Sequence, residues 1–307
     1  MPSSSVAVLG EALVDEFHDG PVAGGAPFNV ARSLAGLGSP PLFVGRIGAH
    51  DEHGRLVLDS ARRYGLDTAG LQRDASHPTG RVSVHEGVGG HRFEIRADAA
   101  WDHIDVDAAR RHLAEANAAL IYFGSLAQRH AVSRAALRAL VKPFAGTRFL
   151  DLNLRPGDDA RLLAAESLML ADWVKLNDEE LAQLAGWFDA AAPEEAGQAA
   201  AVMARFALER LVLTCGARGW RLYGPGGGLL AQGAGVAQPH VVDTVGAGDA
   251  FTALLLAGLA RQRDLPATLA LANRYASFIC GVRGPLPTDP IALQPWRTAL
   301  HALPRST

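Results

Sequence analysis

The stretch Val241-Val242-Asp243-Thr244-Val245-Gly246-Ala247-Gly248-Asp249-Ala250-Phe251-Thr252 decides how the rest of the chain is interpreted. After the small-residue turn Gly246-Ala247-Gly248, the apolar run 250–260 predicts a buried helix with Asp249 in its first turn. A helix start carries unpaired N–H groups and a partial positive charge, and glycines let these groups approach an anion. The segment therefore predicts an anion site beside a carboxylate, which suits phosphoryl transfer to a hydroxyl.

Two better-known phosphate motifs are absent from the sequence. There is no G-x-x-x-x-G-K-[ST], and the only lysines are Lys142 and Lys175. Phe251 stands where the dinucleotide fingerprint needs its third glycine. Because a Gly-x-Gly turn before a helix can also serve tight packing alone, the short pattern by itself leaves both interpretations open.

The composition is that of an ordinary globular protein. The chain has 307 residues, 49% hydrophobic and 20% charged, and its net charge of −3 predicts no general attraction to nucleic acid or anionic membranes. The run 250–260 is too short to span a bilayer, and residues 1–5 lack the charge and apolar core of a signal peptide. Cys215 and Cys280 form no C-x-x-C motif. We therefore expect one cytoplasmic domain over residues 1–307.

A second glycine-rich stretch, Ala23-Gly24-Gly25-Ala26-Pro27-Phe28-Asn29, precedes a predicted helix. Asn29 lies in the first turn of that helix and can both donate and accept hydrogen bonds, which suits a neutral polyol. The alternative is a glycine turn followed by a helix cap. Asp15 comes just beyond the predicted first strand, where ligands of open α/β sheets gather. A solvated loop acid is the alternative for Asp15.

Polar residues also follow predicted strands later in the chain. Asn153 and Arg155 project from the carboxyl end of a strand predicted over residues 148–156, where an arginine could pair with a phosphate or a carboxylate. Asn177 and Glu180 are three residues apart and share one helix face. Their spacing also matches a capping box, with Asn at the N-cap and Glu at N3.

Alternating segments at 81–85 and 91–96 predict a hairpin with a glycine-rich turn at 87–90. With residues 11–25, the strands within 80–97 would form a small sheet apart from the main core. Arg96 at the end of the hairpin is either a substrate contact or a surface arginine. Elsewhere strands alternate with helices, which predicts a largely parallel sheet covered by helices on both faces.

The twelve-residue signature closely resembles the C-terminal signature of the PfkB, or ribokinase-like, family of carbohydrate kinases. Gly24-Gly25-Ala26-Pro27-x-Asn29-Val30-Ala31 resembles the family's N-terminal sugar-binding motif, especially that of fructokinases. Three further segments are similar to family motifs: Asp151-x-Asn153-x-Arg155-Pro156, Asn177-x-x-Glu180 and Thr214-x-Gly216-x-x-Gly219. The resemblance runs from Gly10 to about Thr288. It implies a ribokinase-like three-layer α/β sandwich with a small β lid over the sugar.

The resemblance also implies roles for individual residues. The residue matching Asp249 is the catalytic base, and the turn Gly246, Ala247 and Gly248 binds the transferring phosphate. The expected sugar contacts are Asp15, Gly24, Gly25, Asn29, Arg96, Asn153 and Arg155. The expected nucleotide contacts are Asn177, Glu180, Thr214, Gly216, Gly219 and Asn273. Glu180 would organise Mg²⁺, mostly through water. Asp243 matches a residue of the K⁺ site found in many family members. The tail 281–288 departs from the usual family sequence, so the resemblance does not establish cation activation here.

The implied activity is transfer of the γ-phosphoryl group of ATP to a sugar hydroxyl, with fructose as the first substrate to consider. The alternatives within the family are 2-keto-3-deoxygluconate kinase, ribokinase and nucleoside kinase. A different class of alternative is a sugar sensor without catalysis. The expected partners are the sugar, ATP, Mg²⁺ and, if the cation site is kept, K⁺. No nucleic acid or membrane partner is expected, and the lid offers a surface for a homodimer.

Overall fold

Strand β1, Ser5–Leu9, shows why the chain folds in layers. Val6 and Val8 face one hydrophobic core, while Ala7 and Leu9 face a second core on the other side of the sheet. A strand covered on both faces is apolar throughout, as in parallel sheets. The computed structural model describes residues 5–18, 20–87, 90–189, 192 and 194–306.

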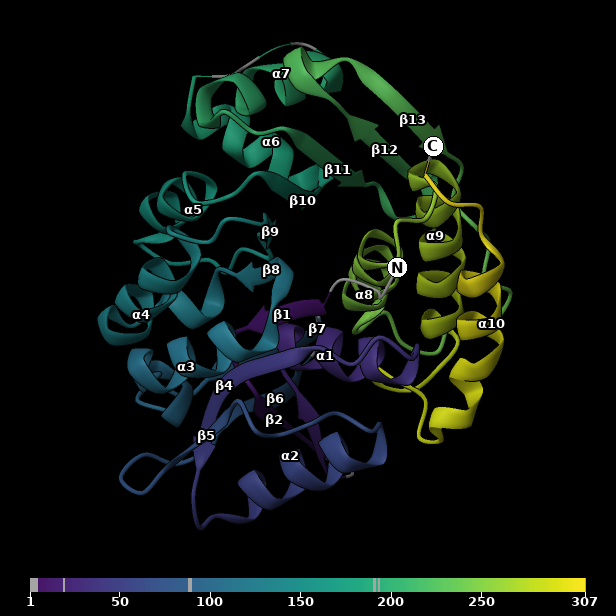
Figure 1. Ribbon diagram of the computed structural model, residues 1–307. Helices are drawn as coiled ribbons and strands as arrows, with labels where there is room; N and C mark the ends of the chain where they lie inside the picture. The colour runs from purple at the N-terminus through teal and green to yellow at the C-terminus, as the bar shows by residue number, and fades with distance from the viewer. Residues whose placement is uncertain (1–4, 19, 88–89, 190–191, 193, 307) are drawn as a thin grey trace.

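Nine strands of the described residues form the main sheet, in the order β13-β12-β11-β10-β9-β8-β1-β4-β5 (Figure 1). The seven strands β11, β10, β9, β8, β1, β4 and β5 pair in parallel, and β12 and β13 add an antiparallel edge. The remaining bounds are β4 Leu42–Gly48, β5 Leu71–Asp74, β8 Ala118–Gly124, β9 Thr147–Asp151, β10 Trp173–Asn177, β11 Arg210–Thr214, β12 Trp220–Tyr223 and β13 Leu229–Gly233.

Helices cover both faces of this sheet (Figure 1). One layer holds α1 Ala26–Gly36, α2 Glu52–Arg63, α8 Ala247–Ala260, α9 Leu265–Cys280 and α10 Gln294–Ala302. The other layer holds α3 Val106–Ala116, α4 Ala131–Val141, α5 Ala160–Leu168, α6 Asp178–Trp187 and α7 Glu195–Phe206. Within the described part of the chain, no helix has the length and hydropathy needed to cross a membrane. The predicted three-layer α/β architecture is confirmed.

A second, smaller sheet has the order β3-β2-β6-β7. Its strands are β2 Leu13–Phe17, β3 Gly20–Gly24, β6 Gly80–Gly87 and β7 Gly90–Ile95. We call this sheet the lid. β2 begins four residues after β1 ends, so the lid leaves the main sheet at its carboxyl edge. Residues 88 and 89 of the predicted glycine turn lie outside the described residues.

Helix α8 confirms the helix predicted from the signature. Ten of its fourteen residues are buried, and it packs between α1 and α9. A helix that is apolar on all sides belongs in the interior of a protein. One prediction nearby is wrong: the strand expected over 148–156 ends at Asp151. Asn153 adopts a left-handed backbone with φ of 40°, which cannot continue a strand.

Candidate active site

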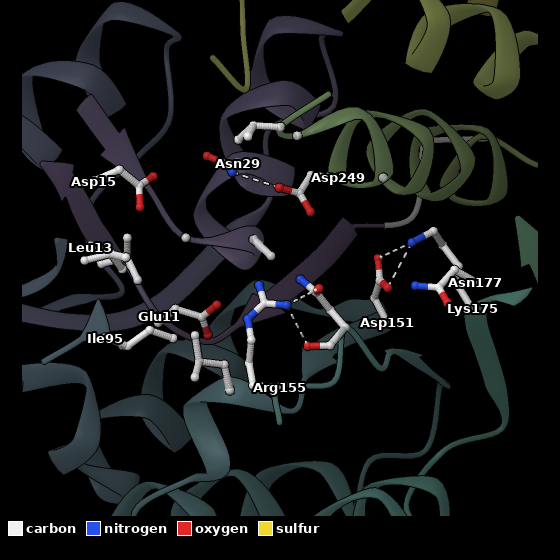
Figure 2. Close-up of a pocket in the computed structure, with 18 of the residues that line it drawn as sticks. Glu11, Leu13, Asp15, Asn29, Ile95, Asp151, Arg155, Lys175, Asn177 and Asp249 are labelled. Carbon is white, nitrogen blue, oxygen red and sulfur yellow. Dashed lines mark hydrogen bonds and ion pairs between the residues drawn. The ribbon is translucent and has the colours of Figure 1, made fainter. Parts of the chain in front are cut away.

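A cavity of about 940 Å³ opens at the carboxyl edge of the main sheet, under the lid (Figure 2). The chain supplies a lining residue just beyond each of several parallel strands: Glu11 after β1, Leu126 after β8, Asn153 after β9 and Thr214 at the end of β11. Ligands of open α/β sheets bind at this edge because the strand-to-helix loops converge there. The sheet therefore determines where a ligand can sit.

The start of α8 forms one wall of this cavity. Gly246 is the N-cap, with φ of 79°, and no side chain caps the helix. A Cβ at Gly246 would lie 2.5 Å from Pro285 Cα, so both conformation and space require glycine here. Gly246, Gly248 and Asp249 line the cavity. Uncapped N–H groups at a helix start that borders a cavity form an anion-binding site.

Asp249 lies half-buried in the first turn of α8 and faces the cavity (Figure 2). Its Oδ2 accepts a 2.8 Å hydrogen bond from Asn29 Nδ2. Burial raises the pKa of Asp249 to about 6, the Asn29 hydrogen bond lowers it, and the charge of Asp151 raises it again. The carboxylate is still roughly nine-tenths ionised at pH 7, so it is a base whose pKa lies near neutrality.

Asp15 and Gly25, two of the residues expected to contact a sugar, line the cavity, whereas Gly24 does not. Asp15 lies on β2, and burial raises its pKa to about 6. A Cβ at Gly24 would lie 2.2 Å from Asp15 Oδ2, so Gly24 leaves room for this carboxylate without lining the cavity itself. Gly25 lines the cavity as the N-cap of α1, with φ of 101°.

Glu11 is a pocket residue that the sequence analysis missed. It is 2% exposed, and its Oε2 has no hydrogen-bond partner in the described residues although it borders the cavity. Burial raises the pKa of Glu11 to about 7, while its own backbone N–H and the charge of Arg155 lower it. Because its Oε2 is free of protein partners in the described part of the chain and borders the cavity, Glu11 is placed to hydrogen-bond to water or to a ligand. A glutamate directly after a buried strand was the available sequence signal.

Asn153 and Arg155 reach the same cavity from the loop after β9. Arg155 donates to Asn153 Oδ1 at 2.8 Å and is exposed at the pocket mouth. Its positive charge lowers the pKa values of Glu11, Asp15 and Asp249, in each case against the larger effect of burial. Arg155 is therefore the cation at the mouth of a pocket rich in carboxylates.

A buried ion pair also lines the cavity and was not predicted. Lys175 Nζ donates to both carboxylate oxygens of Asp151, at 3.0 and 2.9 Å. Thr252 of α8 donates to Asp151 Oδ2 at 2.7 Å. Burial lowers the pKa of Lys175, but the charge and hydrogen bonds of Asp151 outweigh it and the net shift is upward. A Cβ at Gly248 would lie 3.5 Å from Lys175 Nζ, so this cation borders the anion site.

This pair had a detectable signal in the sequence. Asp151 and Lys175 each interrupt an apolar strand, and buried charged residues need a partner. β9 and β10 are adjacent, and their register places Lys175 directly opposite Asp151. The adjacency of these strands, which the sequence does not specify, is what makes the two residues a pair.

Asn177 and Glu180 form the capping box at the start of α6. Asn177 Oδ1 accepts from Glu180 N at 2.7 Å, and Glu180 Oε2 accepts from Asn177 N at 2.9 Å. Glu180 Oε1 also accepts from Leu154 N at 2.8 Å. Both residues line the cavity. Each Glu180 oxygen keeps a second lone pair, which fits hydrogen bonding to a water of a hydrated ion better than direct coordination.

The other expected nucleotide and cation residues lie at and beyond the pocket rim. Thr214 lines the cavity, whereas Gly216 and Gly219 lie in the turn behind it, both with positive φ. Asn273 Nδ2 donates to Ala234 O at 2.8 Å, tying α9 to the segment after β13. Asp243 accepts from Val245 N at 3.0 Å and Gly284 N at 3.1 Å, joining the two loops expected to bind K⁺. Ala247, like Gly216, Gly219 and Asn273, is not a lining residue.

Arg96 is placed outside the cavity. It is exposed at the end of β7, where Ile95 lines the pocket instead. The backbone oxygen of Arg96 accepts a hydrogen bond from Arg129, and its N–H donates to Arg81 O at 3.0 Å. This geometry matches the surface-arginine alternative more closely than a substrate contact.

A histidine cluster lies at the base of the lid, away from this cavity. Donor atoms of His77, Asp98 and His103 lie within 4.8 Å of one another, as a metal site requires. However, the rings of His77 and His103 stack with centroids 3.8 Å apart and planes 15° apart. One ion cannot lie in the planes of two stacked rings, where the nitrogen lone pairs point. The cluster as it stands does not fit a metal ion.

These features define a class of protein: a small-molecule phosphotransferase whose anion site and basic carboxylate share one helix start. Known proteins agree with this class. The family model described as pfkB family carbohydrate kinase matches residues 8–292. The chain belongs to the pfkB family of carbohydrate kinases.

Relatives cover most of the chain. Fructokinase of Klebsiella pneumoniae is 34% identical over 287 residues, covering 87% of this chain and 88% of its own length. The structure of fructokinase with bound ATP from Xylella fastidiosa superposes with a TM-score of 0.81 at 24% identity, covering 96% of this chain and 99% of that one. The structure of a fructokinase double mutant from Vibrio cholerae O395, bound to fructose, ADP and potassium ion, superposes with a TM-score of 0.78 at 25% identity. It covers 96% of this chain and 98% of that one.

Replacing Glu11 should reveal how much its buried carboxylate lowers the free energy of unfolding. The folded pKa of Glu11 is raised from 4.5 to about 7, so its stabilising contribution is complete below pH 4.5 and is lost as the pH rises through 7. We expect Glu11→Gln to unfold with a free energy roughly 1–3 kcal/mol higher than wild type at pH 8, and with no gain near pH 4.5. Urea denaturation at both pH values measures this.

Glu115→Gln, at an exposed site on α3, is the matched control and should leave the free energy of unfolding close to that of wild type. Equal stability of wild type and Glu11→Gln at pH 8 would show that the Glu11 carboxylate is not penalised by burial.

Proposed function

We propose that the protein transfers the γ-phosphoryl group of ATP to a hydroxyl of fructose. The observation that carries the proposal is the juxtaposition of Asp249 with the uncapped start of α8 in one cavity. Support for fructose comes from fructokinase relatives at 30–34% identity over most of the chain. The neutral character of fructose also fits the two carboxylates, Glu11 and Asp15, in the wall of the pocket.

The sugar would occupy the lid side of the pocket. In Figure 2, Glu11, Leu13, Asp15 and Ile95 lie on one side of Asp249. Ionised carboxylates accept hydrogen bonds from sugar hydroxyls, and apolar side chains cover the carbon skeleton. The second hydrogen on Asn29 Nδ2 remains available beside the bond to Asp249. Gly25, Asn153 and Arg155 would complete the sugar site at the pocket mouth.

The reacting hydroxyl would lie against Asp249. The carboxylate accepts the hydroxyl proton as the oxygen attacks, and its pKa of about 6 lets it hold that proton transiently. Negative charge on the migrating phosphoryl group meets the N–H groups at Gly246 to Gly248 and the ammonium of Lys175. These donors are fixed before reaction, since Gly246 caps a buried helix and Lys175 is held by Asp151.

ATP would lie on the opposite side, where Figure 2 shows Lys175 and Asn177. Thr214, which lines the cavity, would contact the phosphates, and Gly216, Gly219 and Asn273 would lie beyond it on the side of the base. Asn177 and Glu180 fit a hydrated Mg²⁺, which would neutralise charge on the nucleotide phosphates when bound.

Removal of Mg²⁺ with a chelator should therefore abolish turnover. Activity that is unchanged by chelation would contradict this assignment.

Two further expectations concern K⁺ and assembly. We propose that the loops joined by Asp243 bind K⁺, which would be seen as loss of activity when K⁺ is replaced by choline. We also propose that the lid sheet forms a homodimer, which light scattering would detect. A monomer at micromolar concentration would contradict the dimer, and equal rates in both salts would contradict the K⁺ site.

The runner-up substrate is a sugar acid such as 2-keto-3-deoxygluconate. Arg155 at the pocket mouth favours it, because a guanidinium pairs well with a carboxylate. Glu11 and Asp15 oppose it by repulsion, and Arg96 is not a lining residue of the cavity. Ribose and nucleosides remain candidates on chemistry alone, since they too are neutral.

A sugar panel tests the substrate proposal directly. With ATP and Mg²⁺, ADP formation should be fastest with fructose, slower with ribose or nucleosides, and at least about tenfold lower in kcat/KM with 2-keto-3-deoxygluconate, a difference of about 1.4 kcal/mol. An ADP-coupled assay measures each sugar. Faster turnover of the sugar acid would overturn the fructose assignment, and sugar binding without ADP formation would identify a sensor.

Asp249→Asn tests the base. The amide keeps the size and one hydrogen-bond acceptor but cannot take the proton, so kcat should fall at least about 100-fold. Sugar affinity measured by calorimetry should stay within about threefold, because the change acts on the reacting hydroxyl. Asp158→Asn, at an exposed loop position, is the control and should match wild type. Retention of more than a tenth of wild-type turnover in Asp249→Asn would rule out this role.

The pH dependence follows from the raised pKa of Asp249. The base must be ionised to work, so kcat/KM should be constant above about pH 7, reach half its maximum near pH 6, and fall about tenfold per pH unit below that. Because Asp15 and Glu11 titrate in the same range, the midpoint belongs to the group of carboxylates. Initial rates from pH 5 to 8.5 measure the curve. A flat profile down to pH 5 would be incompatible with this base.

A further inference from the structure

Arg32, on α1, is a buried cation with no part in the scheme above. It is 4% exposed, and no carboxylate of the described residues lies within ion-pair distance of it. Its partners are neutral: Ser60 Oγ at 2.7 Å, Ala23 O at 2.8 Å and Asn29 Oδ1 at 2.5 Å. Burying a charge without an opposite charge is costly. This cost points to a role other than packing.

The contact with Asn29 fixes which way its amide faces. A guanidinium only donates hydrogen bonds, so the Asn29 atom that faces Arg32 must be the oxygen. The amide nitrogen then faces Asp249, and it donates to Oδ2 at 2.8 Å. The opposite orientation would place an oxygen against a carboxylate and an NH₂ group against a guanidinium. Arg32, Asn29 and Asp249 thus form one directional chain of hydrogen bonds, each link polarising the next.

Arg32 also connects the elements that carry the sugar end. It joins Ala23 of β3 to Ser60 of α2, and β3 pairs with β2 opposite Asp15. The carbon at the centre of its guanidinium lies 4.5 Å from the centroid of the Phe28 ring, so a cation–π contact also holds this side chain in place. The same side chain therefore fixes the lid strand, the start of α1 and the amide beside the base.

We infer that Arg32 is a positioning residue for the base: it locks the Asn29 amide so that Asn29 donates to Asp249, and it supplies a fixed positive charge to the carboxylates of the pocket. The inference rests on the proposed role of Asp249 in sugar phosphorylation. It explains why a chain rich in arginine keeps one of them buried beside its active site without an ion pair.

The charges around Asp249 make this contribution distinct. Asp151 and Lys175 from the main sheet neutralise each other, and Arg155 is exposed to solvent at the pocket mouth. The titratable and charged groups that interact with Asp249 from its neighbouring elements are Glu11, Asp15, Arg32, Tyr122, Asp151, Arg155 and Lys175. Of these described residues, Arg32 is the buried cation that has no carboxylate partner. Its charge lowers the pKa of Asp15, against the larger raising effect of burial.

The first test is Arg32→Met, which keeps an unbranched chain of similar reach and removes the charge and all donors. We expect kcat for sugar phosphorylation to fall about 10- to 100-fold and the KM for ATP to stay within about twofold. The acid limb of kcat/KM should move to higher pH by at least about half a unit, since a nearby cation typically lowers a carboxyl pKa. Arg32→Lys should recover part of both effects.

The control is Ser60→Ala, which removes another Arg32 contact without touching Asn29 and should leave the acid limb in place. A purely structural role predicts a lower melting temperature for Arg32→Met with an unchanged acid limb, and that result would overturn the inference.

A double-mutant cycle tests the path through Asn29. If Arg32 acts by orienting the amide, Arg32→Met should add less than about twofold to the loss in kcat already caused by Asn29→Leu. Losses that multiply in the double variant would show that the two residues act independently, and would overturn the positioning role.

A titration that needs no turnover separates this inference from the proposed function. The ¹³C resonance of the Asp249 carboxyl group, identified by its absence in Asp249→Asn, reports its protonation directly. A higher midpoint in Arg32→Met supports the inference even if no sugar yields ADP, which would refute the proposed function alone. An unchanged midpoint, with fructose phosphorylation intact in wild type, would overturn the Arg32 inference and leave the function standing.

Discussion

The structure depends on a buried helix that begins at the wall of a cavity. Helix α8 is apolar on all sides and packs in the interior, yet no side chain caps its first N–H groups. Its first turn is only half-buried, because it opens on the cavity, where water or an anion can reach these groups. The left-handed Gly246 and the small residues beside it make that opening possible. The same dozen residues thus bury the helix and leave its first N–H groups beside the cavity.

Much of the site could be predicted because its residues are close in sequence. The turn at Gly246 to Gly248, the position of Asp249 and the capping box of Asn177 and Glu180 all depend on contacts between near neighbours. Such contacts leave a pattern of glycines, carboxylates and fixed spacings. The alternation of apolar strands and helices was sufficient for the layered fold for the same reason. These features depend on interactions between residues close in sequence, and not on which strands become neighbours.

The parts that could not be predicted depend on which strands become neighbours. Lys175 pairs with Asp151 because β9 and β10 lie side by side, and Glu11 is shielded from solvent because the start of α1 packs against it. Arg32 reaches Asn29 from one helical turn away, but its burial requires β3 and α2. Arg96 had two interpretations in the sequence, and only the structure shows that it is exposed and that Ile95 lines the cavity instead. Long-range packing, not spacing, sets these environments.

The division of the pocket between two sheets has an evolutionary consequence. Asp15 belongs to the four-stranded sheet, while Lys175 belongs to the nine-stranded one and the capping box follows it at the start of α6. Under the proposed function, inherited changes in the smaller sheet would therefore reshape the acceptor end and leave the donor end as it is. Duplicated copies of such a gene could acquire new acceptors while their nucleotide site stays unchanged. A common donor with many acceptors is the diversity that this architecture permits.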